Sequence, residues 1–192
     1  MNAALKEPTW ISPETYLAQE LAADTKHEYL DGYVYAMSGA SKNHQSIAAN
    51  VLANIHTHLK GTPCHPYGSD VKIKAGNYFF YPDAMVVCQD QTNNDYYTES
   101  PLLVVEVLSK PTCILDKTRK FKAYQSLSSV MEYVLIEQDI VDVEVCRRPS
   151  GWMPNHYFLG DEVHLESIDC HLPVAEIYRW VENEDMAAFL AQ

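Results

Sequence analysis

The chain has 192 residues, of which 47% are hydrophobic and 21% charged, so its composition is that of an ordinary folded domain and excludes disorder, collagen and coiled coil. Its formal net charge is −12, from 14 Lys and Arg against 26 Asp and Glu. That charge disfavours a nucleic-acid partner unless a local basic patch or bound metal ions offset it. It suits an enzyme with a small substrate equally well.

The apolar runs are too short for a transmembrane helix, and the first residues lack the pattern of a signal peptide. We therefore expect a single domain over residues 1–192, located in the cytoplasm and without a membrane partner. The cysteines are odd in number and widely spaced, at Cys64, Cys88, Cys113, Cys146 and Cys170. Because no C-x-x-C pair occurs, the pattern favours buried, reduced thiols over a disulfide framework or a zinc site.

The N-terminal third predicts a helix, a hairpin and a second helix. Ser-Pro-Glu at 12–14 is typical of a helix start, and this helix should end near Ala22. Asp-Gly at 31–32 separates two runs of β-prone residues and predicts a hairpin over 27–37. An apolar stripe at helical spacing then predicts a helix over 44–59.

The remaining elements alternate between strands and helices. We expect strands at 71–74, 78–88, 102–108, 131–137 and 141–147, a loop at 89–100, a helix at 116–127, a meander near 156–166 and short helices at 174–180 and 184–190. The continuously apolar runs 84–88 and 102–108 indicate burial on both faces of a sheet. The order predicts an α/β or α+β fold, with a mixed sheet flanked by helices.

Two carboxylates break the apolar pattern of these strands. Glu106 lies inside 102–108, where an ionised group is costly unless it is paired or bound to a metal, so a buried salt bridge and a metal site are both open. Asp83 follows Pro82 at the start of a buried run. It is either a site residue at the mouth of the strand or an ordinary Asp in the turn that begins the strand. If the two strands pair, both carboxylates meet at one end of a sheet and provide the hard oxygen ligands of Mg²⁺ or Mn²⁺.

Lys120 and His44 are polar residues on the apolar stripes of two predicted helices. At about 100° per residue, Lys120 falls between Ala123 and Tyr124, and Asp116 shares its face. Lys120 either pairs with Asp116 while its stem covers apolar surface, or serves a buried site. His44 opens the stripe of its helix and faces the core, either as a satisfied core residue or as a site residue.

Several of these residues belong to short motifs that recur in a known order. In chain order they are His27-Glu28-Tyr29-Leu30-Asp31-Gly32, Met37-Ser38, His44, Tyr81-Pro82-Asp83, Val104-Val105-Glu106-Val107-Leu108-Ser109, Asp116, Lys120-Phe121, Tyr124 and Glu132-Tyr133-Val134-Leu135. In this order and spacing, over residues 12–148, they resemble the putative restriction endonuclease family of the PD-(D/E)XK nuclease superfamily. The resemblance implies a restriction-endonuclease-like core of mixed sheet flanked by helices.

The resemblance also implies catalytic residues. Asp83 and Glu106 match the metal-binding carboxylates of the family, and the backbone carbonyl of Val107 would join them on Mg²⁺ or Mn²⁺. The superfamily usually places a Lys two residues after the Glu, where this chain has Leu108. In this family that Lys lies on the following helix, which gives Lys120 the role of orienting the attacking water or stabilising the transition state.

The resemblance further implies that Glu28 and His44 are accessory site residues. It also implies a nucleic-acid substrate, with DNA favoured over RNA. A homodimer is expected because cleaving both strands of DNA favours two sites. Local basic residues are Lys72, Lys74, Lys117, Arg119, Lys120, Lys122, Arg147 and Arg148, although a solvated helix face also explains those at 117–122. Two other functions stay open: a non-catalytic interaction module with a nuclease fold, and a metal-dependent hydrolase of a small phosphoester.

Overall fold

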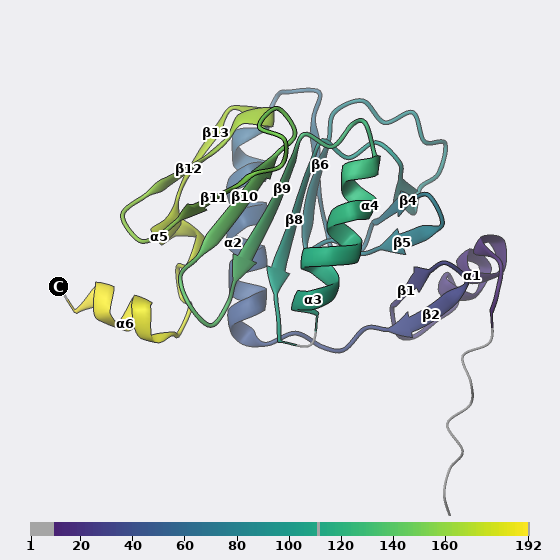
Figure 1. The fold of residues 1–192 in the computed structure, drawn as a ribbon, viewed down its shortest axis with the longest axis horizontal. Helices are drawn as coiled ribbons and strands as arrows, with labels where there is room; N and C mark the ends of the chain where they lie inside the picture. The colour runs from purple at the N-terminus through teal and green to yellow at the C-terminus, as the bar shows by residue number, and fades with distance from the viewer. Residues whose placement is uncertain (1–9, 111, 192) are drawn as a thin grey trace, which may run out of the picture.

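The structure, a computed structural model, describes residues 10–110 and 112–191 (Figure 1). Its helical segments are α1 (Pro13–Glu20), α2 (Lys42–His58), α3 (Cys113–Leu115), the π-helix η1 (Asp116–Lys120), α4 (Phe121–Ser126), the 3₁₀ turn η2 (Glu166–Ile168), α5 (Val174–Ile177) and α6 (Glu184–Leu190). Its strands are β1 (His27–Leu30), β2 (Tyr33–Ala36), β3 (His65–Gly68), β4 (Lys72–Ala75), β5 (Tyr78–Phe80), β6 (Ala84–Val87), β7 (Tyr97–Thr98), β8 (Leu103–Leu108), β9 (Glu132–Glu137), β10 (Val143–Arg147), β11 (Pro154–Tyr157), β12 (Glu162–Leu165) and β13 (Cys170–Pro173).

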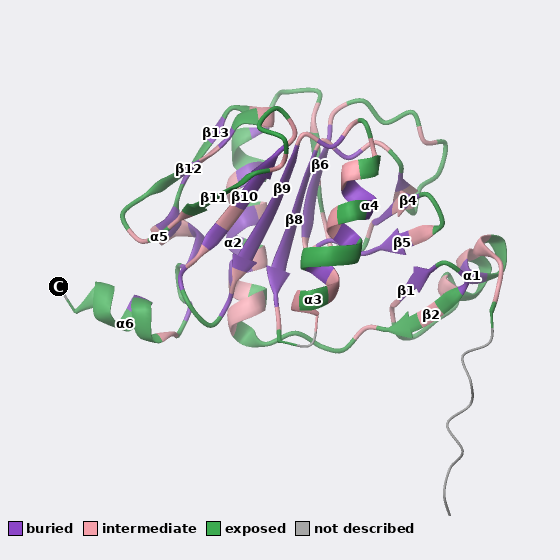
Figure 2. Cartoon of the chain, in the orientation of Figure 1, coloured by how far each residue is buried: buried purple, intermediate pink, exposed green. Residues whose placement is uncertain are grey.

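The centre of the fold is a mixed sheet in the order β11-β10-β9-β8-β6-β3, in which β8 and β9 are parallel and the other neighbours antiparallel. Helix α2 crosses one face, and α3 and α4 cover the other (Figure 1). Along β8, Leu103, Val105 and Val107 join the core under α2, whereas Val104 and Leu108 join the core under α4. All of β8 is therefore buried, as Figure 2 shows, which confirms the burial expected from its apolar run.

A second, smaller sheet has the order β2-β1-β5-β4-β7, with only the β4–β7 pair parallel among the strands described. The single strand expected over 78–88 is wrong, because β5 belongs to this sheet and β6 to the central one. The chain changes sheets at Tyr81–Asp83. Pro82 has no N–H to donate, which explains why strand pairing is interrupted there. This crossing places Asp83 where the two sheets meet.

The mixed sheet flanked by helices confirms the predicted fold class. The hairpin at Asp31–Gly32 is also confirmed, since Leu30 pairs with Tyr33 and both turn residues have positive φ, as a two-residue turn requires. Strands β3, β7 and β13 were not expected; β3 contains Pro66 and Gly68, and β7 has only two residues. The helix expected over 116–127 instead begins as the π-helix η1.

One cysteine expectation is wrong. Cys64 and Cys88 form a disulfide that links the chain just before β3 to the chain just after β6. Those strands pair in register, so the two residues lie opposite each other, which a sequence separation of 24 residues does not reveal. The thiols of Cys113, Cys146 and Cys170 are free, and the latter two are buried as expected.

Among the helices of the described residues, none combines the length and the apolar character that crossing a membrane demands.

Candidate functional site

A cleft of about 920 Å³ opens between the β1–β2 hairpin, the start of α2, the end of β8 and η1. It is lined by every site residue that the sequence predicts: Glu28, His44, Asp83, Glu106, Val107 and Lys120. The two sheets bring these residues together from five separate segments of the chain. The structure therefore places the predicted set in one location.

Asp83 and Glu106 come together across the antiparallel pair β6–β8. Ala84 pairs with Val105, so continuing the register by one residue sets Asp83 opposite Glu106. The backbone N–H of Val107 donates to Asp83 Oδ2 at 2.7 Å. The two carboxylates thus lie on neighbouring strands at one end of a sheet, the arrangement on which the sequence argument depends.

Lys120 lies at the centre of three carboxylates, one of which is Glu106. Its Nζ is 3.0 Å from Glu28 Oε1, 3.1 Å from Glu106 Oε1 and 3.1 Å from Asp116 Oδ1. The Lys120 side chain is 6% exposed, so its charge is hidden from water. The expected pair with Asp116 is present, whereas the ammonium does not extend to solvent and lies in the predicted cleft.

Neighbouring groups hold two of these carboxylates in position. The hydroxyl of Tyr124 donates to Glu106 Oε1 at 3.0 Å, and the backbone N–H of Tyr81 donates to Glu28 Oε1 at 3.3 Å. Asp116 and Lys120 both belong to η1 and both are buried. A π-helical turn is rare and is often found at functional sites.

Burial dominates the electrostatics of the cleft. It raises the pKa of Glu106 well above its usual range, against the lowering effect of the Lys120 charge. Burial also raises the pKa of Asp83, although His44 and the Val107 N–H oppose it. Burial alone lowers the pKa of Lys120, but the charges of Glu106, Glu28 and Asp116 outweigh it, and the pKa is raised well above its ordinary value. The ammonium therefore stays charged. It is the single positive charge shared by the three carboxylates that contact it.

His44 lines the cleft beside Asp83. Its Nε2 lies 3.4 Å from Asp83 Oδ2, and its backbone N–H donates to the Ser41 hydroxyl that begins α2. Its Nδ1 is buried without a hydrogen-bond partner among the described residues. The helix start thus sets the imidazole against the carboxylate that precedes β6.

Sequence reasoning did not identify Gln138, which lines the cleft. Its Nε2 donates to the carbonyl of Leu108 at 2.9 Å, and its Oε1 accepts from the Ser41 hydroxyl. It therefore connects the end of β8 to the start of α2, the two segments that carry Glu106 and His44. A lone Gln after a strand gives no signal of such a role in the sequence.

The oxygens of the cleft fit a hard divalent cation. Within the described chain, the hydrogen bonds and ion pairs of Asp83 all use Oδ2 and those of Glu106 all use Oε1, which leaves Asp83 Oδ1 and Glu106 Oε2. Among the described residues, no three ligand atoms of the cleft lie within 4.8 Å of one another, because its carboxylates surround Lys120. Mg²⁺ suits such a site because it is commonly held by one or two carboxylates and completes its shell with water and phosphate.

Most of the basic residues named from the sequence do not form a patch at the cleft. Lys72 and Arg147 are buried, Lys74 pairs with Glu99, and Lys117 pairs with Glu137. Besides Lys120, the cleft is lined by Arg119, Lys26 and Lys110, and of these three only Arg119 was named from the sequence. Positive charge therefore comes from three separate segments of the chain.

Comparison with known proteins gives one consistent result. The family model Uma2, described as "Putative restriction endonuclease", matches residues 13–175. Two proteins of Synechocystis sp., both described as uncharacterized, are similar: slr1290 is 36% identical over 175 residues, 88% of this chain and 92% of the relative, and sll1609 is 31% identical over 158 residues, 79% and 89%.

A solved structure shares the fold. It is the crystal structure of a "putative nuclease belonging to DUF820" from Anabaena variabilis, with a TM-score of 0.73 and 16% identity over 90% of this chain and 99% of that one. The family match spans most of the chain, including each residue predicted for the site. The chain belongs to the Uma2 family of putative restriction endonucleases.

Proposed function

We propose that the cleft hydrolyses phosphodiester bonds in nucleic acid, with DNA as the substrate and Mg²⁺ or Mn²⁺ as the cofactor. The observation that carries the proposal is the pair Asp83 and Glu106, opposed across β6–β8 beside a buried cluster of carboxylates. Three carboxylates contact one buried ammonium there, and Asp83 adds a fourth carboxylate beside His44. Such an excess of negative charge attracts a divalent cation. Family membership points to the same class of activity.

Asp83, Glu106 and the Val107 carbonyl would hold the metal ion, which when bound lowers the pKa of a water ligand and offsets the charge that builds on the phosphate. The Val107 N–H and His44 both engage Asp83 Oδ2 and so orient its other oxygen. Tyr124 and Lys120 do the same for Glu106 through Oε1.

Lys120 supplies the fixed positive charge of the site. Three carboxylates hold its ammonium in one place, so it needs little reorganisation to stabilise negative charge on a phosphate or to orient the attacking water. Glu28 acts as an accessory residue by fixing this ammonium, and His44 by fixing Asp83. Lys120 of η1 thereby takes the place of the Lys that the superfamily carries two residues after the Glu, where this chain has Leu108.

The rim of the cleft supports a polyanionic substrate. Lys26, Lys110 and Arg119 line the cleft from three segments, where they can contact backbone phosphates. Lys26 and Lys110 would exchange their ion pairs with Asp70 and Asp139 for these contacts. Their charge is local, whereas the chain as a whole carries −12. Binding should therefore weaken steeply with salt, as phosphate contacts require.

The test begins with metal binding. Mn²⁺ is titrated calorimetrically into the wild-type chain and into Asp83→Asn and Glu106→Gln, with Asp139→Asn as a control for an exposed carboxylate on the rim. We expect binding in the wild type and the control, and its loss in both site variants. Cleavage of plasmid DNA in the presence of Mg²⁺, with the same variants, then tests the activity.

A wild-type chain that neither binds Mn²⁺ nor cleaves DNA with Mg²⁺ contradicts the proposal and favours a non-catalytic module with a nuclease fold. The net charge of −12 gives a specific reason to test a third function, hydrolysis of a small phosphoester. Release of phosphate or a nucleoside from mononucleotides, without cleavage of DNA or RNA, identifies that case.

We also propose that the active form is a homodimer, because cleavage of both strands of a duplex is most direct with two clefts. Light scattering on the purified chain measures the mass in solution. A mass of one chain under the conditions of cleavage contradicts this part of the proposal.

A further inference from the structure

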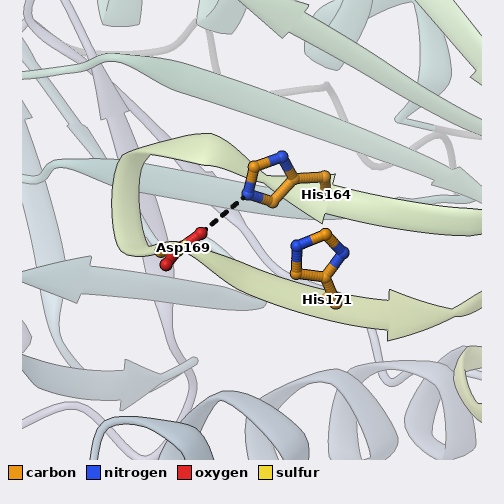
Figure 3. A group of neighbouring side chains, drawn as sticks. All are labelled: His164, Asp169 and His171. Carbon is orange, nitrogen blue, oxygen red and sulfur yellow. Dashed lines mark hydrogen bonds and ion pairs between the residues drawn. The ribbon is translucent and has the colours of Figure 1, made fainter.

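A second group of metal-ligating side chains lies on the β12–β13 hairpin and shares no residue with the cleft (Figure 3). His164 of β12 and His171 of β13 are directly opposite each other in the antiparallel register. Asp169 precedes β13 at the end of the turn between the strands. One ligand atom from each of the three residues lies within 4.8 Å of the other two.

The two imidazoles are arranged as a pair. Their rings stack with centroids 4.2 Å apart and planes 10° from parallel, and His164 Nε2 lies 3.1 Å from Asp169 Oδ1. In Figure 3 each ring turns one nitrogen toward the side on which Asp169 lies. Two nitrogens and one carboxylate oxygen from three residues thus lie within 4.8 Å of one another, and a shared ion would turn the two stacked rings toward it.

A fourth residue holds the second imidazole as a metal ligand requires. His171 Nδ1 is 2.8 Å from Glu162 Oε1, which leaves Nε2 as the atom that faces the group. A carboxylate behind a ligating imidazole fixes the tautomer and the ring orientation, and this is the usual arrangement around protein-bound zinc. The hairpin therefore carries three ligands and one supporting residue.

The backbone presents these side chains on a fixed platform. Asp169 has φ 49° and ψ 44°, a left-handed conformation that is uncommon outside glycine, and it turns the chain back beside His164. The turn is tied to the central sheet, because the backbone N–H groups of Glu166 and Ser167 donate to the buried carboxylate of Glu132. The backbone of the hairpin is therefore already ordered, and a metal ion would bind with little loss of backbone conformational entropy.

The donor atoms and their exposure identify the class of ion. Imidazole nitrogens favour zinc and its transition-metal neighbours over Mg²⁺ and Ca²⁺, and two imidazoles with one carboxylate form a common three-residue zinc set. The side chains of His164 and His171 are 39% and 54% exposed, so an ion in solution reaches them directly. Water would fill the remaining position.

We propose that His164, Asp169 and His171 bind one divalent transition-metal ion of the zinc type, which joins the two strands of the hairpin. This site is independent of the proposed nuclease function, since the cleft offers carboxylate oxygens for a hard cation and the hairpin offers nitrogen ligands. Its expected effect is to stabilise the hairpin and, through Glu132, its attachment to the central sheet.

The experiment isolates the hairpin from the cleft. Zn²⁺ is titrated calorimetrically into a parent chain that carries Asp83→Asn and Glu106→Gln, and into the same parent with His164→Gln or His171→Gln added. We expect one Zn²⁺ per chain in the parent and, in both histidine variants, an affinity weaker by a factor of about ten or more. His156→Gln is the matched control, because His156 forms a similar pair with Asp142, at 2.8 Å, on strand β11. That control should leave the affinity unchanged.

A second readout confirms the ligands without any assay of activity. Co²⁺ in place of Zn²⁺ should give visible d–d absorption in the parent, and this absorption should disappear in His171→Gln. Thermal unfolding without metal should be the same in all variants, because the substituted side chains are exposed. The proposal is overturned if the parent does not bind one equivalent, or if both histidine variants bind Zn²⁺ as tightly as the parent.

Discussion

Asp83 Oδ2 accepts a hydrogen bond from the backbone N–H of Val107 at 2.7 Å, so the carboxylate that precedes β6 is tied to the strand that carries Glu106. This bond holds Asp83 at the point where the chain has just crossed from one sheet to the other. It makes the spacing of the two carboxylates a property of strand register and not of side-chain flexibility. The cleft therefore has its charged groups in place before any ligand binds.

The burial of the Asp83 charge leads to the first prediction. Without a metal ion, Asp83→Asn should stabilise the chain by about 1 kcal/mol, because burial and, to a smaller extent, the nearby Asp116 disfavour the charged carboxylate, while the amide oxygen still accepts from Val107. Urea unfolding of the metal-free variant and the wild type measures the difference. Destabilisation by the same amount would show that the charge of Asp83 is well compensated in the absence of metal.

Lys120 should behave in the opposite way. Lys120→Met leaves Glu28, Glu106 and Asp116 without their shared cation, and loss of one partner of a buried ion pair costs about 3–5 kcal/mol. Chemical unfolding measures this loss. If Mn²⁺ can compensate the same carboxylates, it should raise the melting temperature of the variant more than that of the wild type. An equal or smaller rise in the variant would contradict this reasoning.

The turn of the first hairpin gives a test of the fold around Glu28. Gly32 has φ +100°, and a Cβ at this position would lie 1.9 Å from the Trp10 ring. Gly32→Ala should therefore destabilise the chain by about 2 kcal/mol, the sum of backbone strain and displacement of the ring. Thermal or urea unfolding measures the loss.

Gly76→Ala is the matched control for that prediction. Gly76 also has positive φ, at +60°, but its Cβ would meet nothing within 4 Å. It should carry the cost of the backbone alone, about 1 kcal/mol. Equal losses in the two variants would show that the Trp10 contact contributes nothing to the hairpin.

The cysteine pairing is directly countable. Under denaturing conditions without reductant, a thiol reagent should detect three thiols, those of Cys113, Cys146 and Cys170, and five after reduction. Five thiols before reduction would contradict the Cys64–Cys88 bond. If the bond is present, closing a loop of this length should contribute about 3 kcal/mol to stability, measured as the difference between oxidised and reduced chains.

The elements with strong local signals were predictable from the sequence. The burial of β8 on both faces follows from an unbroken apolar run, and the turn at Asp31–Gly32 follows from residues that tolerate positive φ. The same logic exposed Glu106 and Lys120, because a charge within an apolar pattern is costly unless a partner compensates it. Each of these signals is local, and the structure agrees with them.

Other features depended on contacts between distant segments. The crossing at Pro82 assigns β5 and β6 to different sheets, and the disulfide depends on the pairing of β3 with β6. Gln138 became relevant only when its amide reached Leu108 and Ser41. The sheet crossing, the disulfide and the Gln138 contacts produce no periodicity or characteristic spacing in the sequence, so no sequence pattern predicts them.

The sequence by itself determined which charged residues lie in apolar surroundings, because hydrophobic periodicity and side-chain chemistry can be assigned to each residue from the sequence alone. Only the tertiary structure decided how those charges are shared. The π-helical turn η1 brings Lys120 to Glu28 and Glu106, which lie 92 and 14 residues away, and the β12–β13 register brings His164 to His171. Such meetings depend on the packing of whole elements, and packing is a property of the folded chain rather than of any stretch of it.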